Sequence, residues 1–295
     1  MARALLIYNP AAARTRPKHL KVVCDTLSSE GWKVDAVATT RPGDETKLAL
    51  EGVSAAVDVI AVYGGDGTAI RAFTGMIDSD IPLGLVRGGT GNLLATNLRL
   101  PRAPALAART IARGTPHAID LGRLTCGETE RYFAVACGAG FDAQLMALTS
   151  GQSKRRWRMA AYMVKAWELL GNLEESHFRI SVDGQAFEVK AAAVLIANCG
   201  AILPPVVSLG PGISLDDGLL DVIALSARNR LEGLSAIWRL ITQSADGRGV
   251  KRARGKSITV SSDEVVLVES DGDQGGTTPF AAEVVPGRLK VMIPL

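Results

Sequence analysis

Two short glycine-rich segments carry the clearest chemical signal in the sequence. The first comprises Gly64, Gly65, Asp66, Gly67 and Thr68. It follows the apolar run 57–63 directly, and its glycines leave backbone N–H groups open to an anion because no Cβ blocks phosphate oxygens. A helix starting at Ala69 would add the positive end of its dipole. The segment therefore predicts phosphate binding, and a plain turn with a helix cap is the alternative.

Asp66 and the second glycine segment extend this prediction. A carboxylate beside phosphates would repel them, so we expect Asp66 to act through a bound Mg²⁺. The second segment, GGTGN at 88–92, follows the next apolar run, and Arg87 precedes it directly. Arg87 could neutralise phosphate charge, while Thr90 and Asn92 could bond a nucleotide or cap the next helix. Two such segments after strands are typical of the ligand crevice of an open α/β sheet.

Two acidic segments stand further along the chain. The turn DDGLLD at 216–221 can offer a carboxylate and flanking carbonyl groups to a hard cation, or it can be a solvated acidic turn. The segment DGD at 271–273 follows an apolar run, and acidic residues beside a Gly turn are ordinary. If this segment faces the crevice, Asp271 becomes a candidate general base for a hydroxyl group.

Other catalytic motifs are missing from the sequence. The segment 249–257 approaches a Walker A motif, but its gap is one residue too long, and neither GxGxxG nor GxSxG occurs. With only three histidines, a Ser-His-Asp hydrolase is not expected. The four cysteines form no CxxC pair, so we expect buried free thiols rather than a zinc or redox site. They are Cys24, Cys126, Cys137 and Cys199.

Composition predicts a folded α/β protein without a membrane span. The chain has 295 residues, of which 47% are hydrophobic, and this excludes global disorder and indicates two domains of ordinary size. A net charge of +3 does not by itself imply a nucleic-acid partner, and we expect none. The N-terminus lacks a signal-peptide pattern, and no apolar run is long enough to span a membrane. We therefore expect a soluble, cytoplasmic protein.

Strand and helix patterns alternate over the first part of the chain, which predicts a doubly wound parallel sheet. Asn9 follows the first expected strand and would lie in the same crevice as the glycine segments. The expected strands are 4–8, 32–38, 57–63 and 81–86, and the expected helices are 18–30, 44–52, 69–76, one from about 92, and 104–113.

The pattern changes near residue 120 to a strand-rich region that resembles an antiparallel sandwich. The expected strands are 118–124, 131–137, 176–182, 185–198, 219–224, 257–268, 280–285 and 288–293, and the expected helices are 154–170 and 230–244. Two basic runs, 154–158 with its Trp157 and 248–256, are either solvated surface or segments that contact anionic lipid.

Taken together, these motifs resemble the diacylglycerol kinase catalytic family, specifically the soluble bacterial lipid kinases. The resemblance covers nearly the whole chain. The segments that carry it, in the family's order, are LLIYNP at 5–10, GGDGT at 64–68, GGTGN at 88–92, GFDA at 140–143, DDGLLDV at 216–222, DGD at 271–273 and VVPGRLKV at 284–291. NAD kinases share GGDGT, so the C-terminal segments discriminate better. Ile70 and Arg71 stand where many relatives have Asn-Glu, and Asp273 replaces a common Glu.

The resemblance implies an α/β ATP-binding domain, 1–119 with about 286–295, and a β-rich lipid-substrate domain, 120–285. ATP would lie between them and touch Asn9, Thr39, the loop Gly64–Thr68 and Thr90. Asp271 matches the general base, and Asp217 matches a magnesium ligand together with the carbonyl groups of Ser214 and Leu219. Asp66 and Asp271 would face each other across the nucleotide.

The implied function is ATP-dependent phosphorylation of a lipid hydroxyl, with diacylglycerol or a related lipid as acceptor, in phospholipid biosynthesis. The implied partner is a lipid at the inner membrane face, with peripheral membrane contact, and a homodimer is left open. Two alternatives stay open: a kinase for a soluble acceptor such as NAD, and an inactive nucleotide- or lipid-binding protein. Retention of Asp66 and Asp271 weighs against the inactive protein.

Overall fold

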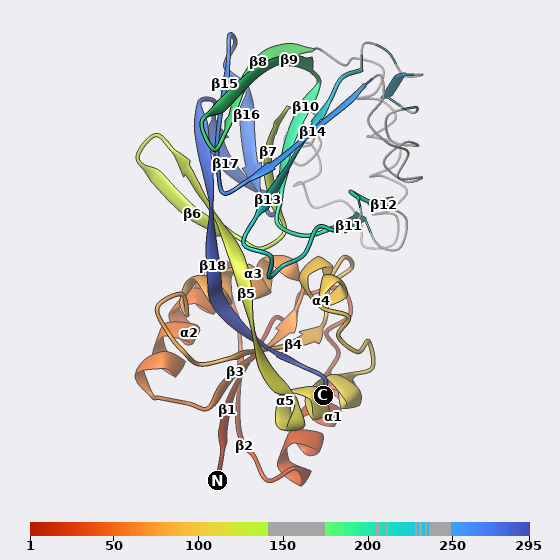
Figure 1. The fold of residues 1–295 in the computed structure, drawn as a ribbon. Helices are drawn as coiled ribbons and strands as arrows, with labels where there is room; N and C mark the ends of the chain where they lie inside the picture. Colours follow the sequence, from red (N-terminus) through yellow and green to blue (C-terminus); the bar gives the residue numbers. More distant parts are fainter. Residues whose placement is uncertain are drawn as a thin grey trace. The chain divides into compact units, whose positions relative to one another are not determined.

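The chain forms two compact units in the computed structural model, which describes residues 1–140, 175–203, 207–210, 212–227, 249–295 and positions 229, 232, 233 and 235 (Figure 1). The first unit consists of Met1–Asp120 with Pro286–Leu295, and the second of Leu121–Val285. In the part of the chain that is described, no helix has the length and apolar character to cross a membrane.

A parallel sheet with the strand order β2-β1-β3-β4 forms the centre of the first unit, and the end of β18 lies beside β4. The strands are β1 (Arg3–Tyr8), β2 (Lys33–Ala38), β3 (Val59–Gly64), β4 (Leu83–Arg87) and β18 (Phe280–Ile293). Every residue of β3 is buried, as expected for a central strand with both faces covered.

Helices cover both faces of this sheet. They are α1 (Pro17–Ser29), α2 (Asp44–Ser54), α3 (Asp66–Thr74), α4 (Leu93–Asn97) and α5 (Pro104–Arg113). Leu6 of β1 shares a core with Val23 of α1 and Ile111 of α5. The neighbouring Leu5 points to the opposite face, where it lies against Gly52 of α2. The predicted doubly wound α/β architecture is confirmed.

The second unit is a sandwich of two antiparallel sheets. One sheet has the order β14-β13-β10-β7-β16-β17, and the other contains β18, β15, β8 and β9 in that order, with β5 and β6 paired to each other. Buried residues of both sheets form one core, for example Phe178 and Ile258 with Ile196 and Val222. The predicted sandwich-like C-terminal region is therefore confirmed.

The strands of the second unit are β5 (Thr115–Cys126), β6 (Thr129–Phe133), β7 (Ala136–Gly140), β8 (Ser176–Val182), β9 (Gln185–Ala191), β10 (Ala193–Ala197), β11 (Ala201–Leu203), β12 (Val207–Ser208), β13 (Leu220–Leu225), β14 (Val250–Gly255), β15 (Ser257–Ser262), β16 (Leu267–Ser270) and β17 (Asp273–Thr277). Of these, β5 begins in the first unit. Strand β17 was not among the expected strands. The expected helix 154–170 and nearly all of 230–244 fall outside the described residues.

Several expected elements have other bounds. The expected strand 131–137 is two strands, because backbone N–H groups between them bond a carboxylate instead of a neighbouring strand. The runs 185–198 and 257–268 likewise divide into β9 with β10 and β15 with β16. The two strands expected at 280–285 and 288–293 are one, β18. It continues through Gly287, whose φ is +61° and whose N–H donates to buried Asp120 (2.7 Å).

Candidate active site

The carboxyl ends of the four parallel strands bring the predicted crevice residues into one row. Tyr8 pairs with Tyr63 in β3 and with Ala38 in β2, so the residues after these strands share one edge of the sheet. Asn9 is directly linked to the first glycine segment, because its Nδ2 donates to Thr68 Oγ1 (3.3 Å). Thr39 begins the loop after β2 and is buried. The structure therefore gathers Asn9, Thr39 and the segment 64–68, as predicted for a crevice.

The two glycine segments pack directly on each other. Gly88 N donates to the carbonyl oxygen of Gly64 (2.7 Å). A Cβ on Gly89 would lie 2.5 Å from the Cα of Gly65, and one on Gly88 would lie 3.0 Å from the Cα of Gly64. Such distances exclude any side chain, so glycine is needed for close approach of two backbones. Exposed Thr90 stands at the tip of the second segment.

Helix α3 begins at Asp66, three residues earlier than expected. Gly65 has an extended conformation, and its carbonyl oxygen accepts the first helical hydrogen bond from Ala69 N (3.1 Å). The glycines and Asp66 therefore stand at the positive end of the helix dipole rather than in a separate loop. An anion at this edge would meet the backbone N–H groups of the first turn of α3.

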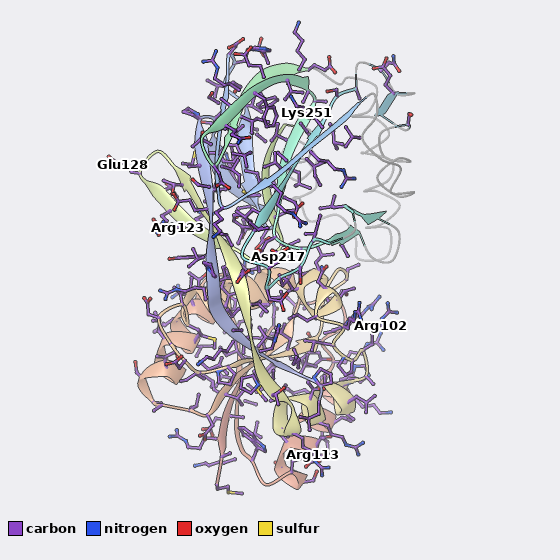
Figure 2. All side chains as sticks on the ribbon, viewed as in Figure 1. Arg102, Arg113, Arg123, Glu128, Asp217 and Lys251 are labelled. Atoms are coloured by element: carbon purple, nitrogen blue, oxygen red, sulfur yellow. The ribbon has the colours of Figure 1, made fainter. Side chains whose placement is uncertain are left out.

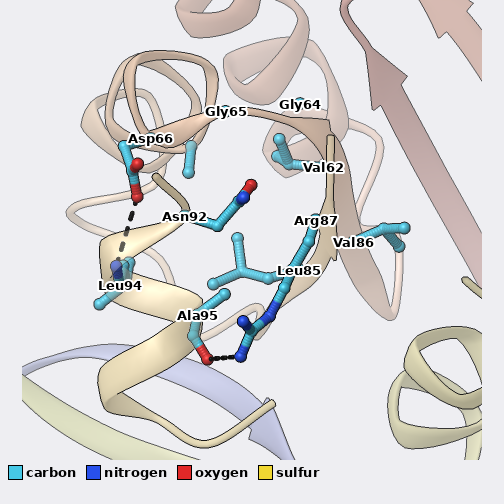
Figure 3. Close-up of a pocket in the computed structure, with 11 residues that line it drawn as sticks. Val62, Gly64, Gly65, Asp66, Leu85, Val86, Arg87, Asn92, Leu94 and Ala95 are labelled. Carbon is cyan, nitrogen blue, oxygen red and sulfur yellow. Dashed lines mark hydrogen bonds between the residues drawn. The ribbon is translucent and has the colours of Figure 1, made fainter. Parts of the chain in front are cut away.

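The Asp66 carboxylate connects the two glycine segments. Its Oδ1 accepts a hydrogen bond from Leu94 N (3.3 Å), drawn in Figure 3, and a Cβ on Gly91 would lie 3.0 Å from its Oδ2. Burial raises the pKa of Asp66, and the N–H groups of Leu94, Leu93 and Asn92 oppose this only in part. Asp66 is partly buried, and a carboxylate whose pKa is raised in this way is a candidate functional residue.

A small cavity lies beneath the glycine segments, lined among others by Val62, Gly65, Asp66 and Asn92 (Figure 3). Its volume of about 10 Å³ has room for about one water molecule. The cavity is therefore too small to hold a nucleotide. Asn92 is buried and bonds both Gly89 N and Gly89 O (2.9 Å each), so it closes its own loop and does not cap α4.

Arg87 does not serve as the predicted phosphate contact. Its guanidinium donates to the carbonyl oxygens of Ala95 (2.8 Å) and Leu100 (2.6 Å) and to Thr96 Oγ1 (3.1 Å). These acceptors lie at the end of α4, where carbonyl groups lack helical partners, and the Ala95 bond is visible in Figure 3. The prediction was wrong because Arg87 is the last residue of β4 and its side chain points toward α4.

We expect the Asp66→Asn variant to be more stable than the wild type at neutral pH without ligands. The raised pKa means that the folded wild type loses stability as pH rises from the ordinary Asp value, about 4, through the folded value. Each unit of pKa elevation corresponds to about 1.4 kcal/mol. Asn keeps an acceptor for Leu94 N but has no proton to lose. Urea unfolding at several pH values checks this, and equal pH dependence of both proteins would contradict it.

Asp271 stands in a tight hairpin turn of the second unit. Strands β16 and β17 pair at Ser270 and Asp273, so Asp271 and Gly272 form the two-residue loop, with φ values of +49° and +88°. Asp-Gly at two positive φ angles is typical of a type I′ turn. In the sequence, the Asp-Gly pair at 271–272 is the signal that could have predicted a hairpin here. The structure shows this hairpin in the pairing of β16 with 273–277.

Three backbone N–H groups hold the Asp271 carboxylate. Oδ2 accepts from Ala134 (2.7 Å), and Oδ1 accepts from Val135 (2.9 Å) and Ala136 (3.0 Å). Asp271 N in turn donates to the carbonyl oxygen of Ala136 (2.9 Å). These three donors therefore fix the carboxylate in position, as a general base needs.

Glu269 is a buried carboxylate of this hairpin that was not predicted as a site residue from the sequence. Its Oε2 accepts from Gly272 N (3.0 Å) and so supports the turn that carries Asp271. The pKa of neighbouring Cys137 is well above its ordinary value, mainly through burial and further through the charges of Glu269 and Asp271. The sequence signal for Glu269 is the alternation of side chains along β16. Val268 faces the core, so Glu269 faces away from it.

The predicted metal ligands lie on one acidic turn of the second unit, where Figure 2 labels Asp217. Asp217 Oδ1 accepts from Leu219 N (3.0 Å), and the Ser214 hydroxyl donates to Asp216. Asp217 Oδ2 is 3.9 Å from Arg254 Nη1. Ser214, Asp217 and Leu219 all lie on this turn, and carboxylate and carbonyl oxygens are of the type that Mg²⁺ binds.

The second basic run has partners inside the second unit. Arg254 binds both carboxylate oxygens of Asp221, and Arg252 donates to the carbonyl oxygen of Leu209. Lys251 lies over the Phe187 ring, 4.0 Å from its centre. Lys251, Arg252 and Arg254 of β14 therefore all have partners within the second unit. The first run, 154–158, falls outside the described residues.

Asp66 and the glycine segments belong to the first unit, and Asp271 and the acidic turn belong to the second. That Asp66 and Asp271 face each other therefore stays a prediction.

Comparison with known proteins shows the family. Residues 3–124 match the diacylglycerol kinase catalytic domain, and residues 135–293 match the YegS C-terminal NAD kinase beta sandwich-like domain. The chain is 29% identical to a Bacillus subtilis diacylglycerol kinase, with 100% of this chain and 97% of the relative covered. It is 30% identical to a probable YegS-like lipid kinase of Stenotrophomonas maltophilia, with 90% and 88% covered.

A solved structure has the same fold. A putative diacylglycerol kinase of Bacillus anthracis superposes with a TM-score of 0.80 at 25% identity, over 99% of this chain and 97% of the other. Kinases of the matched catalytic family use ATP. With both halves of the chain matched, the protein belongs to the diacylglycerol kinase catalytic family and is a lipid kinase of the type that carries a YegS C-terminal domain.

Proposed function

We propose that the protein transfers the γ-phosphoryl group of ATP to the hydroxyl group of diacylglycerol or a closely related lipid. The observation that carries this proposal is the pair of glycine segments packed at the carboxyl edge of the sheet, with α3 beginning between Gly65 and Asp66. Phosphoryl transfer depends on positioning and charge stabilisation more than on covalent chemistry, and such an edge supplies both.

The first unit holds the nucleotide in this proposal. Backbone N–H groups at the start of α3 bind phosphate oxygens, and the N-terminus of α3 stabilises their charge. The further contacts come from the side chains along the same edge. They are Asn9, Thr39, Thr68 and Thr90, with Gly64 and Asp66 completing the first segment.

Asp271 accepts the proton of the lipid hydroxyl in this proposal. As the hydroxyl oxygen bonds to the γ-phosphorus, the bond from that phosphorus to the bridging oxygen breaks, ADP leaves, and the proton passes to the carboxylate. The three N–H donors from 134–136 support this role because they fix the carboxylate. The hairpin turn fixes the backbone that carries it.

Ser214, Asp217 and Leu219 are the proposed ligands of Mg²⁺ in the second unit, through one carboxylate and two carbonyl groups. Bound there, the cation would neutralise the acidic turn and fix its shape. Asp66 is proposed to contact Mg²⁺ that accompanies the nucleotide phosphates, since a partly buried carboxylate beside phosphates otherwise repels them.

We expect Asp217→Asn to raise the Mg²⁺ concentration needed for half-maximal activity by about tenfold, since one charged ligand is lost at an otherwise unchanged turn. Asn still accepts from Leu219 N, so the turn keeps its shape. Magnesium titration of the rate, and of the melting temperature, measures the effect. Asp183→Asn is the control, since it changes one carboxylate on another turn. Equal magnesium dependence of the wild type and Asp217→Asn would contradict the assignment.

The acceptor places the reaction at a lipid surface, so we propose peripheral contact with the inner face of the membrane and a role in phospholipid biosynthesis. The test compares acceptors at fixed ATP and Mg²⁺: diacylglycerol, a sphingoid base and phosphatidylglycerol in detergent micelles, and NAD in solution. We expect the highest kcat/KM for diacylglycerol. A higher value for NAD would overturn the lipid assignment.

A further inference from the structure

The Arg71 guanidinium lies against the first glycine segment. In an α-helix, side chains tilt toward the N-terminus, so a long side chain at 71 reaches back over position 67, one turn earlier. Arg71 does this: a Cβ on Gly67 would be 3.3 Å from Nη2 and 3.4 Å from Nη1. Since Gly67 has no side chain, the guanidinium is next to the backbone of the segment.

Glu45 of α2 fixes the guanidinium from the other side. Its Oε2 accepts from Arg71 Nε (3.3 Å) and from Gly43 N (3.0 Å). Thr46 Oγ1 also donates to the carbonyl oxygen of Arg71 (2.7 Å), which ties α2 to α3 at the same place. These contacts hold the side chain in one orientation, so little conformational entropy is lost when it binds a ligand.

The two members of this ion pair differ in exposure. The Glu45 side chain is 2% exposed, whereas that of Arg71 is 29% exposed. Of this pair, the guanidinium is therefore the member that solvent and ligands can reach. A guanidinium suits phosphate oxygens, because its planar N–H groups can bond two of them at once.

We propose that Arg71 binds a phosphate group of the nucleotide at the Gly64–Thr68 segment and that Glu45 positions it. This inference rests on the proposed function, since it requires ATP at this edge of the sheet. The alternative is that the pair only ties α2 to α3.

The test measures binding of ATP, ADP and adenosine by calorimetry to the wild type and to Arg71→Met, Arg71→Lys and Glu45→Gln. We expect Arg71→Met to bind ATP and ADP about tenfold or more weakly, as for loss of a charged hydrogen bond, and adenosine within about twofold of the wild type. Arg71→Lys should be intermediate. Glu45→Gln keeps an acceptor and removes the counter-charge, so its ATP affinity should not fall.

Arg113→Met is the matched control, because it removes an arginine from another ion pair of the first unit, with Glu30 (2.5 Å; Arg113 is labelled in Figure 2). Its ATP affinity should equal that of the wild type. A wild type that binds no ATP would overturn the proposed function itself. If the wild type binds ATP, three results overturn the inference alone: an unchanged ATP affinity in Arg71→Met, equal weakening of ATP and adenosine, or equal loss in Arg71→Met and Glu45→Gln.

Discussion

Replacement of Asp271 by Asn will lower kcat for lipid phosphorylation by about a thousandfold while ATP affinity stays within about twofold of the wild type. The amide cannot accept the hydroxyl proton. It does keep one acceptor oxygen for the N–H groups of Val135 and Ala136, while its NH₂ group would oppose the N–H of Ala134. We therefore also expect a stability loss of about 1–3 kcal/mol, which leaves the protein folded at assay temperature.

The control for this variant is Asp263→Asn, which changes an exposed carboxylate of the same unit. Its kcat should match that of the wild type. Urea unfolding establishes the folded fraction of both variants before the rates are compared. Should Asp271→Asn retain kcat within about tenfold, Asp271 is not the base.

A methyl group at Gly89 will prevent the two glycine segments from meeting and will weaken ATP binding by more than tenfold. In Gly89→Ala the new Cβ would lie 2.5 Å from the Cα of Gly65, which is backbone and cannot rotate away. The segments must separate, and the expected loss in free energy of unfolding is about 1–3 kcal/mol, as for other overpacked sites. Calorimetric ATP titration and urea unfolding measure the two effects.

Gly200→Ala is the matched control, because a Cβ there has no neighbour closer than 3.4 Å. It should bind ATP as the wild type does. Wild-type ATP affinity in Gly89→Ala would show that the nucleotide does not depend on the close approach of the two segments.

The sequence predicted the first unit well because its signals are local. Apolar runs followed by glycines indicated the strands, and Pro104 and Gly114 bounded a helix that the structure has at Pro104–Arg113. From this alternation it was possible to predict the crevice at the strand ends, and the register of β1, β2 and β3 brings Asn9 and Thr39 to that edge. The start of α3 was missed because consecutive glycines in a sequence indicate a loop. Only the structure shows that the carbonyl oxygen of Gly65 accepts a helical hydrogen bond.

The second unit was harder to predict because its key contacts join residues far apart in the sequence. The carboxylate of Asp271 interrupts the expected strand 131–137 through bonds to N–H groups about 135 positions away. Arg87 was misassigned for a similar reason: its acceptors at Ala95 and Leu100 depend on how α4 ends. Residue propensities and motif spacing predict neither of these contacts, because tertiary packing determines both contacts.

The central claim is transfer of phosphate from ATP to a lipid, and a radiolabel measures it most directly. Protein, Mg²⁺ and ATP labelled at the γ-phosphate are mixed with diacylglycerol in detergent micelles, and the lipid is extracted and chromatographed. The account predicts label in phosphatidic acid with the wild type and background label with Asp271→Asn. No labelled lipid from folded wild-type protein would contradict the transfer itself, and equal labelling by both proteins would contradict the assignment of Asp271 as the base.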